Sequence, residues 1–197
     1  VLHRELGFWS TLRLLHHFIW RQVTHRPFAS LERAAPISPA ERFTRRQLAP
    51  VLHLHAVLHN TLGLDQQRVM MLLARVVGAT GARFIRHAVG VPSPDVWQRM
   101  SATQRRAVAA TSLDQFLNAE ILTIEEPGAS FAFNVTHCHF VKLCGELNRP
   151  ALAKLFCGAD EVLFGDARFG VELRRESTLA AGDETCTFRF HWDDSPT

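Results

Sequence analysis

Hydrophobic residues recur at helical spacing through the first part of the chain, from Leu2 to about Leu122, and Gly and Pro gather between the hydrophobic segments. The first segment carries apolar residues three or four positions apart and ends near Pro27. The spacing predicts four helices, over about 2–26, 39–62, 65–89 and 93–122. We therefore expect residues 1–122 to form a mainly helical layer.

The hydrophobic period changes to two after Pro127-Gly128. This alternation predicts three strands, around 131–135, 169–173 and 186–190. A helix or helix pair is expected from about Phe140 to Leu163, with a break at 148–150. The pattern predicts an α+β fold, in which a helical N-terminal layer precedes a small antiparallel sheet with one or two packed helices. We expect the 197 residues to form a single domain.

The composition is that of an ordinary globular protein, with 47% hydrophobic and 21% charged residues. The net charge of +3 is too weakly basic to predict a nucleic-acid partner. No stretch approaches the ~20 apolar residues of a membrane span, and no secretory signal is visible. We therefore expect a cytoplasmic protein with reduced thiols. The apolar segment Phe8–Trp20 is expected to pack on the core or on a partner, with membrane contact as the less favoured alternative. A homo-oligomer is one expected assembly.

The cysteines all lie in the C-terminal third, at Cys138, Cys144, Cys157 and Cys186. Strand alternation directs Phe131, Phe133 and Val135 toward the core. It places Asn134, Thr136 and Cys138 together on the opposite face. An amide, a hydroxyl and a thiol on one polar face are typical of a pocket wall and equally of a solvated surface. The alternation alone leaves both interpretations open.

Two other cysteines have different predicted surroundings. Cys186 shares its strand face with Phe188 and Phe190, which predicts a buried thiol. Cys157 and Asp160 are three residues apart on a predicted helix, so they lie on the same side, at the edge of its hydrophobic stripe. A carboxylate at that edge suits the orientation of a substrate or water, and it equally suits the surface. Its charge would raise the pKa of the Cys157 thiol, which argues against activation of that thiol by Asp160.

His55 and His59 are four residues apart and continue the hydrophobic stripe of the second predicted helix. Two inward imidazoles at this spacing are able to bind a metal, but the set of ligands is incomplete. A hydrogen-bonded pair in a pocket or core is therefore favoured. The sequence contains no Gly-rich phosphate loop, no Gly-x-Ser-x-Gly elbow and no Cys-x-x-Cys pair, and no cofactor is predicted.

Several blocks of the C-terminal part carry a resemblance to a known family. They are Asn134-Val135-Thr136-His137-Cys138 leading into Cys144-Gly145-Glu146-Leu147, then Phe156-Cys157-Gly158-Ala159-Asp160, and finally the stretch from Arg175 to Phe190. In this order they resemble the signature blocks of the L-2-amino-thiazoline-4-carboxylic acid hydrolases. The resemblance covers about 129–191, and it departs from the family pattern at Asn148, where Gly is usual.

The resemblance implies an enzyme that hydrolyses a C–N bond of a small cyclic amidine or thiazoline-like heterocycle. It implies a cysteine nucleophile or a cysteine-lined pocket, with Cys138 as the candidate nucleophile. The remaining residues implied for catalysis are Asp160, Cys157 and Cys186. Those expected to bind substrate are Asn134, Thr136, Arg174, Arg189, His55 and His59. The alternatives are a small-molecule-binding or sensing domain without turnover, and a metalloenzyme that uses the two histidines.

Overall fold

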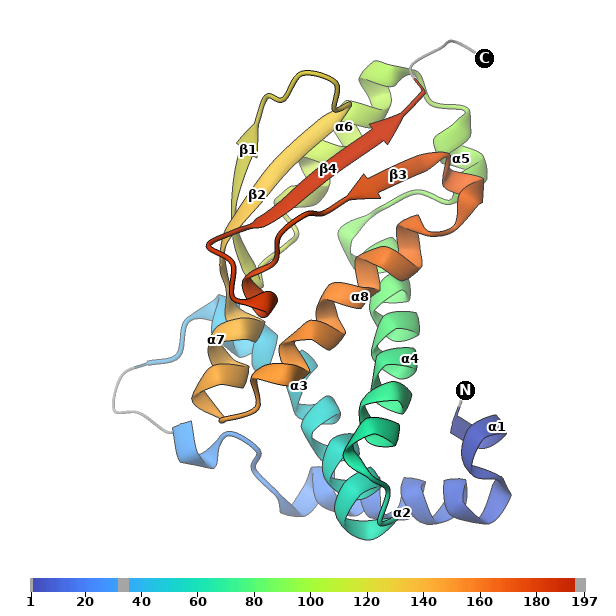
Figure 1. Ribbon diagram of the computed structural model, residues 1–197, viewed down its shortest axis with the longest axis vertical. Helices are drawn as coiled ribbons and strands as arrows, with labels where there is room; N and C mark the ends of the chain where they lie inside the picture. Colours follow the sequence, from blue (N-terminus) through green and yellow to red (C-terminus); the bar gives the residue numbers. More distant parts are fainter. Residues whose placement is uncertain (1, 32–35, 194–197) are drawn as a thin grey trace.

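The computed structural model describes residues 2–31 and 36–193, with a group of helices below and a sheet with packed helices above (Figure 1). The α-helices are α1 (Leu2–Leu6), α2 (Phe8–Thr24), α3 (Pro39–Ala56), α4 (Gln66–Phe84), α5 (Pro94–Gln98), α6 (Ala102–Leu113), α7 (His139–Glu146) and α8 (Ala153–Phe164). π-helical turns follow α3 and α4, at Val57–Thr61 and Ile85–Val89. Short 3-10 turns lie at Ala29–Leu31, Pro150–Leu152, Ala167–Phe169 and Leu179–Ala181.

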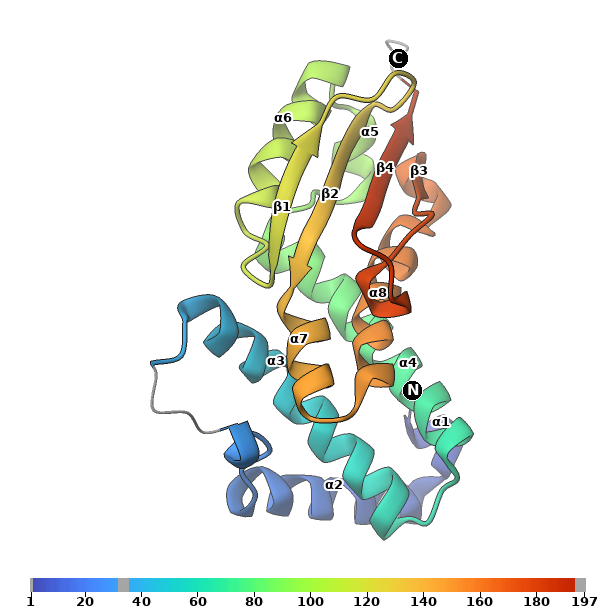
Figure 2. The ribbon, with the colours of Figure 1, turned by 60° about the vertical axis from the view of Figure 1, so that its left-hand side comes forward.

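One antiparallel sheet contains the strands in the order β1-β2-β4-β3. Their bounds are β1 (Ala119–Ile124), β2 (Phe131–Cys138), β3 (Val171–Arg174) and β4 (Cys186–Trp192). Helices α6 and α8 cover one face of the sheet, which we call the inner face (Figures 1 and 2). The rings of Phe133, Phe188 and Phe190 stack on this face, with centroids 4.6 to 6.3 Å apart. The predicted α+β fold, with helices first and the sheet later, is confirmed.

Most predicted helices are present, and local signals explain their ends. Gly7, with φ of 77°, divides the predicted first helix into α1 and α2, since glycine adopts positive φ at little cost. The Asp65 carboxylate accepts a hydrogen bond of 2.8 Å from the backbone N–H of Arg68 and caps α4. The break predicted at 148–150 separates α7 from α8, and Asn148 there has φ of 55°.

The helix predicted over 93–122 is wrong. In the structure this stretch forms α5, α6 and the edge strand β1, so the sheet has four strands rather than three. A capping box starts α6, because the Ser101 hydroxyl accepts from the Gln104 N–H and the Gln104 side chain accepts from the Ser101 N–H. Residues 119–124 are too few for their period to separate a helix from a strand, and pairing with β2 decides the outcome.

Helix α8 joins two hydrophobic cores formed by the described residues. Its first turns pack with Leu155 into the core formed by α2, α3 and α4, and its later turns pack with Leu163 against the sheet. The contact with α4 is very close. A Cβ atom placed on Gly81 would lie 2.6 Å from the Cβ of Ala159, and one on Gly78 would lie 3.1 Å from a methyl carbon of Val162. The separation of α4 and α8 therefore depends on glycine at position 81.

We expect Gly81→Ala to lower the free energy of unfolding by about 1–3 kcal/mol through overpacking. This loss outweighs the better helix propensity of alanine, which is worth up to ~1 kcal/mol. Urea denaturation monitored by circular dichroism measures the change. The matched control is Gly158→Ala on α8, where the new methyl group meets open space, so that a gain of about 0.5–1 kcal/mol is expected. Equal stability of the two variants would contradict the close contact, and Ala159→Gly should partly rescue Gly81→Ala.

Candidate active site

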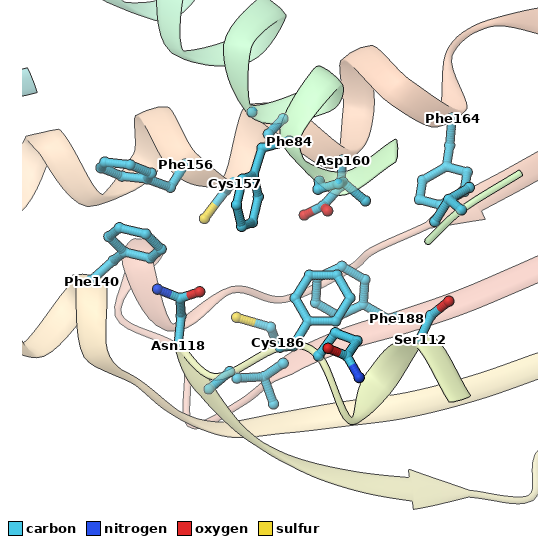
Figure 3. Close-up of a pocket in the computed structure, with 18 of the residues that line it drawn as sticks. Phe84, Ser112, Asn118, Phe140, Phe156, Cys157, Asp160, Phe164, Cys186 and Phe188 are labelled. Carbon is cyan, nitrogen blue, oxygen red and sulfur yellow. The ribbon is translucent and has the colours of Figure 1, made fainter. Parts of the chain in front are cut away.

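A cavity of about 590 Å³ lies between the inner face of the sheet and the helices α3, α4, α6 and α8. Figure 3 shows its two walls, with Phe156, Cys157 and Asp160 of α8 on one side and Cys186 and Phe188 of β4 on the other. Most of the lining is apolar. Among the described residues that line it, Asp160 and Arg175 are the charged ones. The volume is in the range usual for small-molecule sites.

Cys138 reaches this cavity because β2 contains a bulge. Glu120 of β1 pairs with His137 and Ile121 pairs with Val135, so Thr136 has no partner in β1. One extra residue reverses the alternation beyond it. Cys138 therefore lines the cavity with Val135, and Thr136 is exposed.

The prediction that Cys138 shares a face with Asn134 and Thr136 is wrong, since strict alternation holds only along an unbroken strand. Neither Asn134 nor Thr136 lines the cavity. The Thr136 hydroxyl donates a long hydrogen bond of 3.4 Å to the Glu120 carbonyl instead.

The structure brings together the four residues predicted for catalysis, because Cys138, Asp160, Cys157 and Cys186 all line the cavity. Cys157 and Asp160 point into it from one side of α8, and Cys186 faces them from β4 (Figure 3). The predicted burial of Cys186 is confirmed, and its sulfur accepts a hydrogen bond of 3.2 Å from the Leu179 N–H.

Arg175 is the main site residue that the sequence reasoning missed. Its guanidinium donates hydrogen bonds to the carboxylates of Asp160 (3.3 Å) and Glu161 (2.5 Å) and to the Cys157 carbonyl (3.1 Å). It also lies 5.2 Å from the centre of the Phe188 ring, and its side chain is only 7% exposed. Arg175 follows Val171 and Leu173 at a spacing of two residues, so strand alternation places it on the same face as these two side chains. This alternation is a signal in the sequence that would have identified Arg175.

Burial in the apolar cavity raises the pKa of Asp160 to about 6, because desolvation disfavours the charged carboxylate. The nearby Arg175 lowers the pKa of Asp160 and offsets part of this effect, while the charge of Glu161 raises it further. The side chain of Asp160 is 16% exposed, so water still reaches it. Asp160 therefore exchanges its proton close to neutral pH.

Burial also raises the pKa of each cavity thiol. The pKa of Cys157 is raised to about 12, and the pKa of Cys186 is raised as well. The pKa of Cys138 is raised by desolvation even though the N–H groups of Val141 and Phe140, at the start of α7, partly offset the shift. The three thiols are therefore protonated at neutral pH in the free protein.

The two arginines predicted to bind substrate lie outside the cavity. Arg174 is exposed and pairs with Glu172 on β3. Arg189 projects from the outer face of β4. There it donates a hydrogen bond of 3.0 Å to the Asn134 side-chain oxygen and also forms an ion pair with Glu126. Both side chains alternate along their strands with those that point to the inner face, so they point away from the cavity.

His55 and His59 do not line the cavity either, and the predicted inward orientation of His59 is wrong. His59 is exposed and hydrogen-bonds to the Leu64 carbonyl (3.0 Å), while the His55 ring accepts from Arg149 (3.2 Å). The π-helical turn at Val57–Thr61 changes the helical period after α3 and turns His59 out of the stripe that predicted it. His55 precedes this turn and is half-buried. Within 2–31 and 36–193, no group of three or more His, Cys, Asp or Glu residues is arranged to hold a metal ion.

The fold and the site together define an α+β protein with a largely apolar cavity of small-molecule size, whose described lining contains one carboxylate. A family model described as L-2-amino-thiazoline-4-carboxylic acid hydrolase matches residues 54–190, and the chain belongs to this family. Membership confirms the resemblance and makes the protein a hydrolase, with a thiazoline-type substrate implied. Neither curated proteins nor solved structures gave a match to the chain. Across the described segments, no helix is long and apolar enough to cross a membrane.

We expect Asp160 to make stability depend on pH. Its pKa of about 6 in the folded protein lies above the ~4 of an unfolded chain, so folding binds its proton more tightly. The resulting contribution to the free energy of unfolding is about 2–3 kcal/mol. It is fully present below pH ~4 and is lost as the pH rises through 6. Urea denaturation from pH 4 to 7 measures the free energy of unfolding. This free energy should fall more steeply with pH in the wild type than in Asp160→Asn. Asp114 is exposed, so Asp114→Asn should show the same pH dependence as the wild type. The same pH dependence in Asp160→Asn and the wild type would refute the raised pKa of Asp160.

Proposed function

We propose that the protein hydrolyses a C–N bond of a cyclic amidine or thiazoline-like heterocycle that binds beside Asp160. The observation that supports this proposal is the carboxylate of Asp160, which faces an apolar cavity, is held by Arg175 and has a pKa of about 6. A general base is most efficient when its pKa lies near the working pH. Perturbed carboxylates in clefts are also concentrated at functional sites.

In the proposed reaction, Asp160 removes a proton from a water molecule as the water oxygen bonds to the carbon between the ring sulfur and nitrogen. Asp160 returns this proton to the ring nitrogen. It then takes the second proton from the new hydroxyl group and gives it to the same nitrogen as the bond from the carbon to that nitrogen breaks. The carbon becomes a carbonyl, so one water is consumed and the ring opens. Arg175 is a positioning residue, since its hydrogen bonds to Asp160 and to the Cys157 carbonyl fix the carboxylate on α8.

The cavity thiols serve in this proposal as walls rather than as the attacking group. A nucleophilic cysteine needs a lowered pKa, whereas burial raises the pKa of Cys138, Cys157 and Cys186. A neutral thiol is a weak donor and a small apolar surface, which suits the sulfur and carbon edge of a heterocycle. All four cysteines are free, which fits the reduced cytoplasmic location that we also propose.

We expect Asp160→Asn to lower kcat/KM for 2-amino-thiazoline substrates by about 10²- to 10⁴-fold, because the amide cannot accept the proton. The wild-type kcat/KM should fall as the pH drops below about 6, since protonation removes the base. Glu161→Gln is the matched control. This exposed neighbour also pairs with Arg175 but does not line the cavity, so a small effect is expected.

Other results would reject parts of the proposal. If Cys138→Ala abolished turnover in a folded protein while Asp160→Asn retained it, the cysteine would be the nucleophile. A product with a free thiol would show that the C–S bond breaks instead of the C–N bond. Tight binding of the heterocycle without any turnover would favour the small-molecule-binding domain.

A further inference from the structure

The cavity is far larger than the heterocycle after which the family is named. A single five-membered ring with an amino and a carboxyl group occupies on the order of 150 Å³, about five times the liquid volume of one water. The cavity of about 590 Å³ is therefore roughly four times too large for it. Drug-sized ligands normally fill their pockets and bury most of their surface.

The lining is equally unsuited to a small zwitterion. Asp160 lies between Phe140 and Phe156 at one end and Phe164 at the other (Figure 3). The lining beyond the polar groups is formed by aliphatic and aromatic side chains, and the aromatic ones include Trp97, Phe116, Phe131, Phe133, Phe190 and Trp192.

Among the described residues that line the cavity, Arg175 is the one cation, and its guanidinium already bonds to two carboxylates and a carbonyl. A substrate carboxylate in this cavity would lose its water without gaining a free cation to pair with, which is costly. The unpaired donors in the lining, such as the indole N–H groups of Trp97 and Trp192, are neutral. The lining therefore disfavours a substrate that carries its own negative charge.

We propose that the substrate is a larger and mainly apolar molecule, of about 20–30 non-hydrogen atoms. Its cyclic amidine head donates hydrogen bonds to Asp160, and its apolar substituent fills the aromatic part of the cavity. This inference rests on the proposed function for the identity of the head group. The size and apolar nature of the ligand rest on the cavity alone.

Isothermal titration calorimetry on the full chain tests this substrate class with two probes. They are 2-amino-thiazoline-4-carboxylic acid and a 2-amino-thiazoline in which a biphenylmethyl group replaces the carboxylate. Each buried methylene strengthens binding about fourfold, so we expect the biphenyl compound to bind at least 100-fold more tightly.

A pair of neighbouring variants on α6 controls for position. Ala109 lines the cavity, and Ala109→Phe should weaken binding of the biphenyl compound at least tenfold by filling the space. Ala110 is exposed and does not line the cavity, so Ala110→Phe should bind like the wild type. Circular dichroism establishes that both variants are folded.

The outcomes separate this inference from the proposed function. Equal or tighter binding of the small acid, or no effect of Ala109→Phe, overturns the inference even if hydrolysis is observed. Tight binding of the biphenyl compound that Ala109→Phe weakens supports the inference even if neither compound is hydrolysed, and the proposed function then fails alone.

A second inference comes from the outward side of α2, which lies across the lower end of the molecule (Figures 1 and 2). The side opposite the buried Leu14 carries large apolar residues that are 48 to 81% exposed, and we call it the α2 face. Its members are Phe8, Trp9, Leu12, Leu15, Ile19, Trp20 and Val23. Exposed apolar patches larger than a few hundred Å² mark interaction surfaces.

The area of the α2 face fits a second copy of the chain. Its exposure corresponds to about 800 Å² of apolar surface, which is roughly what each partner contributes to a standard specific interface. Four of its members, Phe8, Leu12, Leu15 and Ile19, follow one another at spacings of four, three and four residues. This spacing suits the packing of two copies of the helix about a twofold axis. A membrane-surface helix carries several Lys or Arg residues beside its apolar side, whereas Arg13 is the single exposed one in α2, which is described throughout.

The geometry points to a homodimer formed through the α2 face. Analytical ultracentrifugation should find the wild type as a dimer at micromolar concentration. Ile19→Glu, which buries a charge in the interface, should raise the dimer dissociation constant at least 100-fold. Leu122→Glu on β1 is the matched control, since Leu122 is 57% exposed and Ile19 is 60% exposed, and it should leave the dimer unchanged. A monomer at all concentrations, or a monomer that binds anionic phospholipid vesicles, would overturn this inference.

Discussion

The close contact between α4 and α8 at Gly81 and Ala159 is the constraint on which the site depends. Helix α8 has one side against α4 and the other facing the sheet across the cavity. Its distance from α4 therefore sets how far Cys157 and Asp160 reach toward Cys186 on β4. Protein interiors resist small changes in volume, so a shift at this crossing would be passed to both walls of the site.

The same apolar surroundings produce opposite chemical consequences for the carboxylate and the thiols. Desolvation raises the pKa of Asp160 into the neutral range, where it becomes an effective proton acceptor. It also raises the pKa of the thiols, which keeps them in the neutral, poorly nucleophilic form. Arg175 limits the shift of the carboxylate pKa. One physical cause, removal from water, thus favours activation of water over attack by a thiolate.

Hydrophobic spacing was sufficient to predict the α+β fold and the order of most helices and strands. Long periodic segments such as α3 and α4 were found because many residues report the same period. The spacing failed over 93–122, because the short segment 119–124 fits the helical period and the strand period equally well. It pairs with β2 in the structure. The family blocks located Cys138, Cys157, Asp160 and Cys186, but their order along the chain carries no information on which side chains meet.

The sequence by itself determined the fold class, the family and the chemical types of the candidate residues. The tertiary structure decided which of them share a cavity, because side-chain direction depends on strand register and helix period. The bulge at Thr136 turned Cys138 inward, and the π-helical turn at Val57–Thr61 left His59 outside. The buried pairing of Arg175 with Asp160, 15 residues away in the chain, likewise exists only once α8 packs against the sheet. Periodicity is a local property, whereas register is fixed by partners distant in the chain.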